Sequence, residues 1–194
     1  MGTTEDITLA CTAEQYLVEL RRQSKQAGEL IAGLTVAQFN WQPNAGRSWS
    51  IAQCLEHLTA TNQVYLAAIR PAVQSSRGSQ AEIVYRPGGW LTSRFIASME
   101  PPPKQKFRAF RKIQPKPSQY RSEEVLSHFL SEQEDLAKFV SDSRQLDLGR
   151  IRFWNPFLKG VLFTVSSGLL LIGAHNRRHL WQAERVKEGK GFPS

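Results

Sequence analysis

Four long segments of the chain carry apolar residues at alternating spacings of three and four, which is the repeat of a helix with one buried face. The segments cover about residues 13–34, 50–70, 122–141 and 166–187. The chain has no sustained two-residue alternation, the mark of a half-buried strand, and no segment repeats another. The pattern predicts an all-α chain whose long helices pack side by side.

The second segment has the clearest predicted boundaries. Ser48 or Ser50 is placed to cap its first turn, and Gln53 follows Ser50 at the spacing of a capping box. Pro71 predicts its end, because proline lacks the N–H that a helix interior needs. Its main apolar stripe consists of Ile51, Leu55, Leu58, Tyr65 and Ile69.

Two histidines, His175 and His179, lie one turn apart on the packing stripe of the fourth segment. The same stripe contains Gly168, Leu171, Ile172, Gln182 and Val186. A buried imidazole is costly without a partner, and two rings at this spacing reach the same ion. The pattern therefore favours a shared metal ion over two separately satisfied core histidines.

A third candidate ligand, His57, lies on the second segment, on a stripe beside the main one. That stripe is a boundary face able to meet another helix, and it also carries Cys54, Thr61, Val64 and Ala68. Three imidazoles fill three positions of a tetrahedral metal and leave one open for water or substrate. Such a site is typical of catalytic rather than structural metals.

Two polar side chains are candidates to support the histidines. Glu56 precedes His57 directly, so it points about 100° away around the helix and suits a supporting role better than ligation. Gln182 lies about one turn beyond His179 on the same face, where it is placed to orient a histidine or bound water. Its alternative role is a polar cap on the core.

Other side chains carry weaker signals. Cys54 is the alternative metal ligand, although we do not expect it to bind, and His128 falls off its helix stripe, which predicts a surface position. For Arg178 and Arg185 we expect salt bridges rather than chemistry. Core or pocket-wall positions are expected for Trp41, Trp49, Trp154 and Trp181.

Three motifs carry a family resemblance. They are Trp-Ser-Ile-Ala-x-x-x-x-His-Leu at residues 49–58, Phe-Asn-Trp-Gln-Pro at residues 39–43, and Asn155-Pro156-Phe157 followed by His175-x-x-Arg178-His179-x-x-Gln182 and Arg185-Val186. In this order and at this spacing, the motifs are similar to those of the DinB/YfiT-like superfamily of metal-dependent enzymes. The similarity spans about residues 12–188.

The resemblance implies a four-helix bundle with an up-down-down-up course and a long crossover between its second and third helices. It also implies a divalent metal held by His57, His175 and His179, for which zinc and nickel both suit imidazole ligands. The implied activity is metal chemistry on a small molecule, either hydrolysis or transfer of a low-molecular-weight thiol. Members of this superfamily often pair through their bundle helices, which implies a homodimer formed by a residual apolar face.

A second class of function stays open beside the enzyme. The bundle would then hold a metal or ligand without turnover, or its basic segment would dock on an anionic partner. No residue of the sequence separates these two classes. Turnover of an electrophile in the presence of a thiol would do so.

The basic segment is the second half of the predicted crossover, about residues 74–121. Residues 101–121 contain five prolines, which argue against a long helix, and no acidic residue. Their basic residues are Lys104, Lys106, Arg108, Arg111, Lys112, Lys116 and Arg121. Three interpretations remain: a solvated strap anchored by its aromatic residues, an edge of the metal pocket that attracts an anionic substrate, or a nucleic-acid surface. We expect the solvated strap and no nucleic-acid binding.

Length and composition agree with a single domain over residues 1–194, with a formal net charge of +8. The two cysteines, Cys11 and Cys54, lack a metal-ligand spacing and suit a reducing compartment. Residues 1–6 lack the basic and apolar parts of a secretion signal, and the longest apolar stretch, 161–172, is too short to span a bilayer. We therefore expect a cytoplasmic protein that does not bind membranes.

Overall fold

The computed structural model describes residues 10–76, 84–105, 107–116 and 119–194. The predictions about residues 1–6, Lys106 and Pro117 thus fall outside the described residues. The described chain is mostly helical, as expected, and its strands form two short two-stranded sheets. No helix in these ranges combines the length and apolar character needed to cross a membrane.

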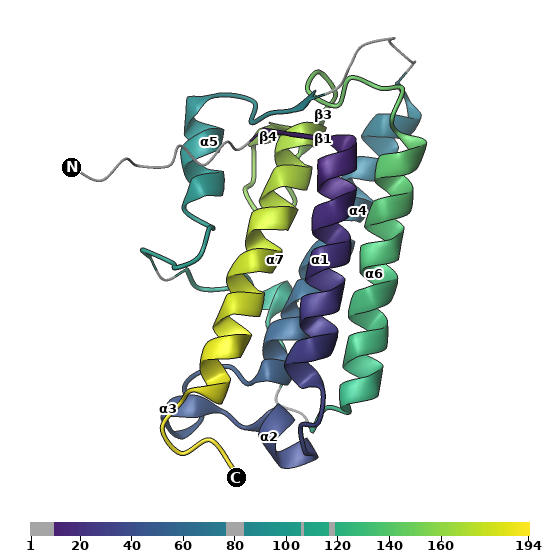
Figure 1. The fold of residues 1–194 in the computed structure, drawn as a ribbon. Helices are drawn as coiled ribbons and strands as arrows, with labels where there is room; N and C mark the ends of the chain where they lie inside the picture. Colours follow the sequence, from purple (N-terminus) through teal and green to yellow (C-terminus); the bar gives the residue numbers. More distant parts are fainter. Residues whose placement is uncertain (1–9, 77–83, 106, 117–118) are drawn as a thin grey trace, which may run out of the picture.

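Four long helices lie side by side (Figure 1): α1 (Ala13–Ile31), α4 (Ile51–Gln74), α6 (Ser122–Asp142) and α7 (Val165–Lys187). Helices α1 and α4 each pack against both α6 and α7. In Figure 1, α1 and α7 run downward, whereas α4 and α6 run upward. This arrangement brings the second and fourth predicted segments, which carry the histidines, into contact.

The helix boundaries follow the sequence signals closely, with two corrections. Ser50 and Gln53 form the expected capping box at the start of α4. Pro71 does not end α4, which continues to Gln74 because proline removes only one N–H and its own carbonyl still accepts from Ser75 at 3.3 Å. Helix α1 ends at Ile31 rather than near the predicted residue 34, because Gly33 adopts a left-handed φ of 74° just beyond it.

The connections contain short elements that the sequence pattern did not predict. Before α4 lie α2 (Val36–Asn40) and α3 (Pro43–Gly46). Strand β1 (Cys11–Thr12) pairs antiparallel with β2 (Val84–Tyr85), and β3 (Arg152–Trp154) pairs antiparallel with β4 (Leu162–Thr164). The crossover from α4 to α6 contains helix α5 (Trp90–Ala97) and the 3-10 helix η1 (Arg111–Ile113).

The interior has two apolar clusters with a layer of buried amides at the level between them. One cluster includes Leu20, Leu136 and Leu169, and the other includes Leu55 and Phe129. The amide layer contains Gln23, Asn62, Gln133 and Asn176. The Asn176 amide nitrogen donates to the Gln23 and Gln133 side-chain oxygens at 3.0 and 3.2 Å, which links α1, α6 and α7.

The crossover covers the side of the molecule where α4 and α7 meet. Helix α5 packs against α7, and η1 packs against α4. The aromatic ring of Phe110 stacks on Phe157 of the β3–β4 connection, with 5.2 Å between ring centres. Together the crossover and this connection enclose the space in front of the histidines.

Candidate metal centre

The three predicted histidines come together between two helices. His57 extends from α4, and His175 and His179 extend from α7, with one candidate ligand atom from each ring within 4.8 Å of the others. Nε2 of His57 lies 3.3 Å from Nε2 of His175. Two nitrogen ligands of a tetrahedral zinc ion, each about 2.0–2.1 Å from the metal, lie roughly 3.3 Å apart. The spacing of this pair therefore fits a shared ion.

Burial makes the histidine cluster costly without a bound partner. His57 is 2% exposed and His179 8% exposed, while His175 is half-buried. Within the described part of the chain, Nδ1 of His175 and Nδ1 of His179 are buried and have no hydrogen-bond partner. A cation shared by the three rings would offset the cost of burying them.

The crossover fixes the orientation of His57. Nδ1 of His57 lies 2.8 Å from the backbone carbonyl oxygen of Ile113, in η1. Because a carbonyl only accepts hydrogen bonds, Nδ1 carries the proton and Nε2 keeps its lone pair toward the other histidines. Glu56, the expected supporting residue, is half-buried and is not among the residues that line the histidine cavity. Sequence reasoning missed Ile113, since a backbone carbonyl has no sequence signature.

The electrostatic surroundings keep the imidazoles neutral. Burial lowers the pKa of all three histidines, well below the usual value for His175 and His179. The neighbouring imidazoles and the positive charge of Arg178 lower the pKa of these two further, whereas Gln182 acts in the opposite direction on His179. Neutral imidazole is the form that binds metals, so protons compete weakly for this site at neutral pH.

Trp49 forms one wall of the site. Its ring centre lies 4.8 Å from that of His57, and it stacks on His179 at 5.7 Å with an angle of 30° between the rings. Trp181 also lines the cavity, and Trp41 packs against Phe192. The expectation of a wall or core position is wrong for Trp154, which is 63% exposed on the outer face of β3.

A cavity of about 460 Å³ opens beside the histidines, lined by α4, α7, the crossover and both shorter connections. Gln182 lines it, as expected for a side chain one turn beyond His179. Phe107, Arg108 and Phe110 of the crossover also line it. The expectation of a solvated strap is therefore incomplete: Lys104, Arg111 and Lys112 are exposed, but other residues of the same segment form a cavity wall.

The alternative ligands do not join the histidine group. Cys54 is fully buried, and burial raises the pKa of its thiol, so it stays protonated. It is not part of the group of potential metal ligands. His128 is exposed on α6, as expected.

The two arginines of the C-terminal motif behave differently. Arg185 pairs with Glu188 and lies over the ring of Trp181 at 5.9 Å, which confirms the expected salt bridge. Arg178 makes no salt bridge within the described ranges. It donates instead to the backbone carbonyls of Ser98 at 3.0 Å and Gln105 at 2.5 Å.

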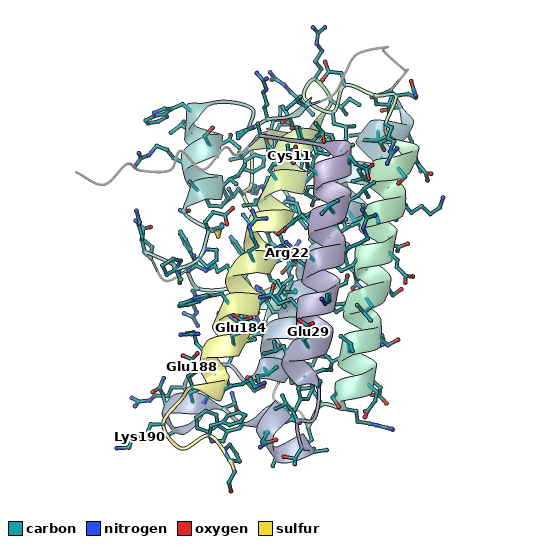
Figure 2. The ribbon with its side chains drawn as sticks, viewed as in Figure 1. Cys11, Arg22, Glu29, Glu184, Glu188 and Lys190 are labelled. Carbon is teal, nitrogen blue, oxygen red and sulfur yellow. The ribbon has the colours of Figure 1, made fainter. Side chains whose placement is uncertain are left out.

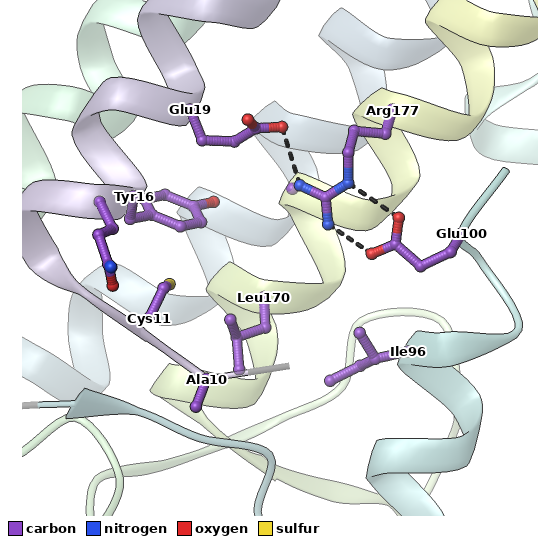
Figure 3. A pocket seen from close by; sticks show the side chains of 10 residues that line it. Ala10, Cys11, Tyr16, Glu19, Ile96, Glu100, Leu170 and Arg177 are labelled. Carbon is purple, nitrogen blue, oxygen red and sulfur yellow. Dashed lines mark hydrogen bonds and ion pairs between the residues drawn. The ribbon is translucent and has the colours of Figure 1, made fainter. Parts of the chain in front are cut away.

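A second, smaller cavity of about 290 Å³ lies between α1, α5 and α7 (Figure 3). Its polar wall is an ion cluster in which Arg177 bridges Glu19 at 2.8 Å and Glu100 at 2.5 Å. Burial raises the pKa of the nearby Cys11 thiol to about 11, so this cysteine is protonated and unreactive at neutral pH. Figure 2 labels Cys11 at the end where α1 begins, far along the molecule from Glu188. Arg22 also pairs with Glu19 at 2.7 Å, so the two carboxylates are balanced by two arginines, and the cluster ties α1 to α7.

The mostly helical fold and the three imidazoles clustered in a cavity wall define a helical protein with a potential metal site. The family model of the DinB superfamily matches residues 19–183, a range that includes all three histidines. The chain therefore belongs to the DinB superfamily. No curated protein and no solved structure matches it.

Proposed function

We propose that this protein is a metal-dependent enzyme that acts on a small molecule and holds a divalent transition metal through His57, His175 and His179. The observation that carries the proposal is the convergence of three imidazoles within 4.8 Å of one another in the wall of a 460 Å³ cavity. A pocket of this size suits a small molecule. Membership of the DinB superfamily supports it further.

The donor set leaves one position of a tetrahedral ion open. When bound, a divalent metal supplies Lewis acidity, which activates water for hydrolysis or a thiol for transfer. The Ile113 carbonyl holds the His57 ring in place, and Trp49 shields two of the rings from water. Gln182 lines the same cavity, where its amide is placed to hydrogen-bond a bound molecule.

The proposed reaction is either hydrolysis of a small molecule or transfer of a low-molecular-weight thiol to an electrophile, with zinc or nickel as the metal. Both metals suit imidazole ligands, and both reactions use the same open position. Turnover of an electrophile that requires an added thiol identifies a transferase, and turnover without thiol identifies a hydrolase. Metal binding with no turnover under either condition identifies a non-catalytic binding protein.

The direct test is the metal content of matched variants. Protein purified without chelator or affinity tag is expected to contain one transition metal per chain by elemental analysis, before or after reloading. His179→Ala is expected to lose most of this metal, because two imidazoles bind an ion much more weakly than three. His128→Ala, on the exposed face of α6, is the control and is expected to keep it.

Circular dichroism of both variants checks that the helices are intact. Wild-type protein with no stoichiometric transition metal after reloading would contradict the proposal. So would an H179A variant that folds and binds metal as the wild type does.

We also propose that the helices form a four-helix bundle of the DinB/YfiT-like type, with an up-down-down-up course. The directions of α1, α4, α6 and α7 in Figure 1 and their cyclic packing support this. A cytoplasmic location is a further proposal, supported by the two free cysteines, Cys11 and Cys54. The single domain over residues 1–194 stays a prediction.

A further inference from the structure

Two adjacent arginines on α7 have opposite electrostatic surroundings. Arg177 pairs with the carboxylates of Glu19 and Glu100. Arg178 is only 7% exposed, yet no carboxylate of the described chain pairs with it, and its N–H groups donate to two backbone carbonyls of the crossover. A buried cation without a counter-charge is unfavourable, so an anion beside Arg178 would be stabilised.

The cavity that Arg178 lines is positive. Arg47 and Arg108 line it too, and no Asp or Glu is among its described lining residues. The two carbonyl contacts of Arg178 use two of the five N–H donors of its guanidinium group. Its remaining donors suit an oxyanion, for which a guanidinium group is well shaped.

Aromatic rings lie around the same positive charge. The Arg178 guanidinium carbon lies 5.4 Å from the ring centre of Phe107, and Phe110 stacks on Phe157 at 5.2 Å. Phe107 and Phe110 line the cavity although each is about half exposed, so part of each ring is free to contact a ligand. Rings in this position favour an aromatic or flat apolar ligand body.

We propose that the cavity binds an aromatic organic anion, whose oxyanion pairs with Arg178 and whose ring packs beside Phe107. This inference rests on the proposed function, because it names the substrate class of the same site. The anion spans from the buried arginine toward the histidine group, since both line one cavity. Arg178 thereby selects charged over neutral molecules of the same shape.

The test compares 1-naphthoate with its neutral isostere 1-naphthamide by isothermal titration calorimetry. Metal-free protein at pH 8 is used first, because metal and protonated histidine are then absent as sources of positive charge. Wild-type protein is expected to bind the acid about tenfold or more tighter than the amide, as a charge-assisted hydrogen bond predicts. Equal binding of the two probes would overturn the inference.

Matched variants locate the effect. Arg178→Met is expected to lose the preference for naphthoate, whereas Arg185→Met, on the same helix but outside the cavity lining, is expected to keep it. Phe107→Leu is expected to weaken the acid and the amide alike, and it decides the location if R178M does not fold. An unchanged preference in folded R178M, or unchanged binding of both probes in F107L, would contradict the inference.

Repeating the titrations with zinc-loaded protein separates this inference from the proposed function. Naphthoate selectivity in a protein that takes up no metal would overturn the metal proposal and leave the anion site standing. Stoichiometric metal together with equal affinities for acid and amide would do the reverse.

Discussion

Gly168 lies where α7 packs tightly against Phe153 of β3 and Ile69 of α4. A Cβ atom there would lie 2.8 Å from Cζ of Phe153 and 3.1 Å from Cδ1 of Ile69, both on buried side chains. Gly168→Ala is therefore expected to destabilise the protein by about 1–3 kcal/mol, the usual range for an overpacked core. Urea unfolding monitored by circular dichroism measures it.

The matched control is Gly28 on α1, where an added Cβ meets nothing within 4 Å. Gly28→Ala is expected to stabilise the protein by about 0.5–1 kcal/mol, because alanine favours a helix interior. Changes of the same sign in the two variants would show that close contact does not limit position 168.

At this same scale, the sequence predicted the histidines and the neighbouring Gln182 and Trp49, but not the backbone contacts or the charge balance of the site. The spacing of His175 and His179 on an apolar stripe, and of His57 on another helix, was enough to predict their convergence. The Ile113 carbonyl and the uncompensated charge of Arg178 were not predictable. Both depend on where the crossover runs, and backbone groups contribute no side-chain pattern.

Among the elements, the crossover differs most from its prediction. Its prolines correctly predicted that no long helix forms between residues 101 and 121 of the described chain. Helix α5, Trp90–Ala97, precedes those prolines and is too short for a clear apolar period. The path of the segment is set by contacts far apart in sequence, such as Lys112 Nζ donating to the Pro156 carbonyl at 3.1 Å, which local patterns do not encode.

The contact of α1 with α7 predicts a dependence of stability on pH. Burial alone would raise the pKa of Glu19, but hydrogen bonds from Arg22, Arg177 and Gln23 outweigh it and lower the pKa from 4.5 to about 2. A carboxylate whose pKa is lower in the folded than in the unfolded chain stabilises the fold fully at pH values above its unfolded-state pKa. This stabilisation is lost as the pH falls toward the folded-state pKa. Wild-type protein is expected to exceed Glu19→Gln in stability above pH 4.5 and to lose that advantage toward pH 2.

Thermal unfolding of both proteins between pH 7 and pH 2 measures this difference. Glu29→Gln is the control on the same helix, labelled in Figure 2, because Glu29 makes one exposed contact with Lys25 at 3.6 Å. Exposed pairs of this kind contribute little, so no measurable change is expected. A pH-independent gap between wild type and E19Q would contradict the role assigned to the ion cluster.

Most exposed large apolar side chains of the described chain lie on the connections rather than on the four long helices. Of the large apolar side chains exposed in the described chain, only Val18 lies on a long helix. Trp154, 63% exposed, and Leu162, 45% exposed, are cross-strand partners on the outer face of the β3–β4 hairpin. An exposed apolar pair of this kind is a candidate for contact with a second copy.

The homodimer stays a prediction, with the β3–β4 hairpin rather than the bundle helices as its expected surface. Light scattering is expected to give twice the chain mass of 22.0 kDa at micromolar concentrations. Trp154→Ser is expected to shift the mass toward 22.0 kDa, and Val18→Ser is expected to leave it unchanged. A wild-type mass of 22.0 kDa across the micromolar range would rule the dimer out.

The buried amide layer limits which substitutions the interior of this protein can accept during evolution. The bonds from Asn176 to Gln23 and Gln133 form only at one alignment of three helices. Sliding α7 by one turn, about 5.4 Å, would break them and carry two histidines away from the third. Substitution of these amides by leucine, in evolution or in design, would make the interior more apolar. It would also remove the hydrogen bonds that hold the helices in one alignment.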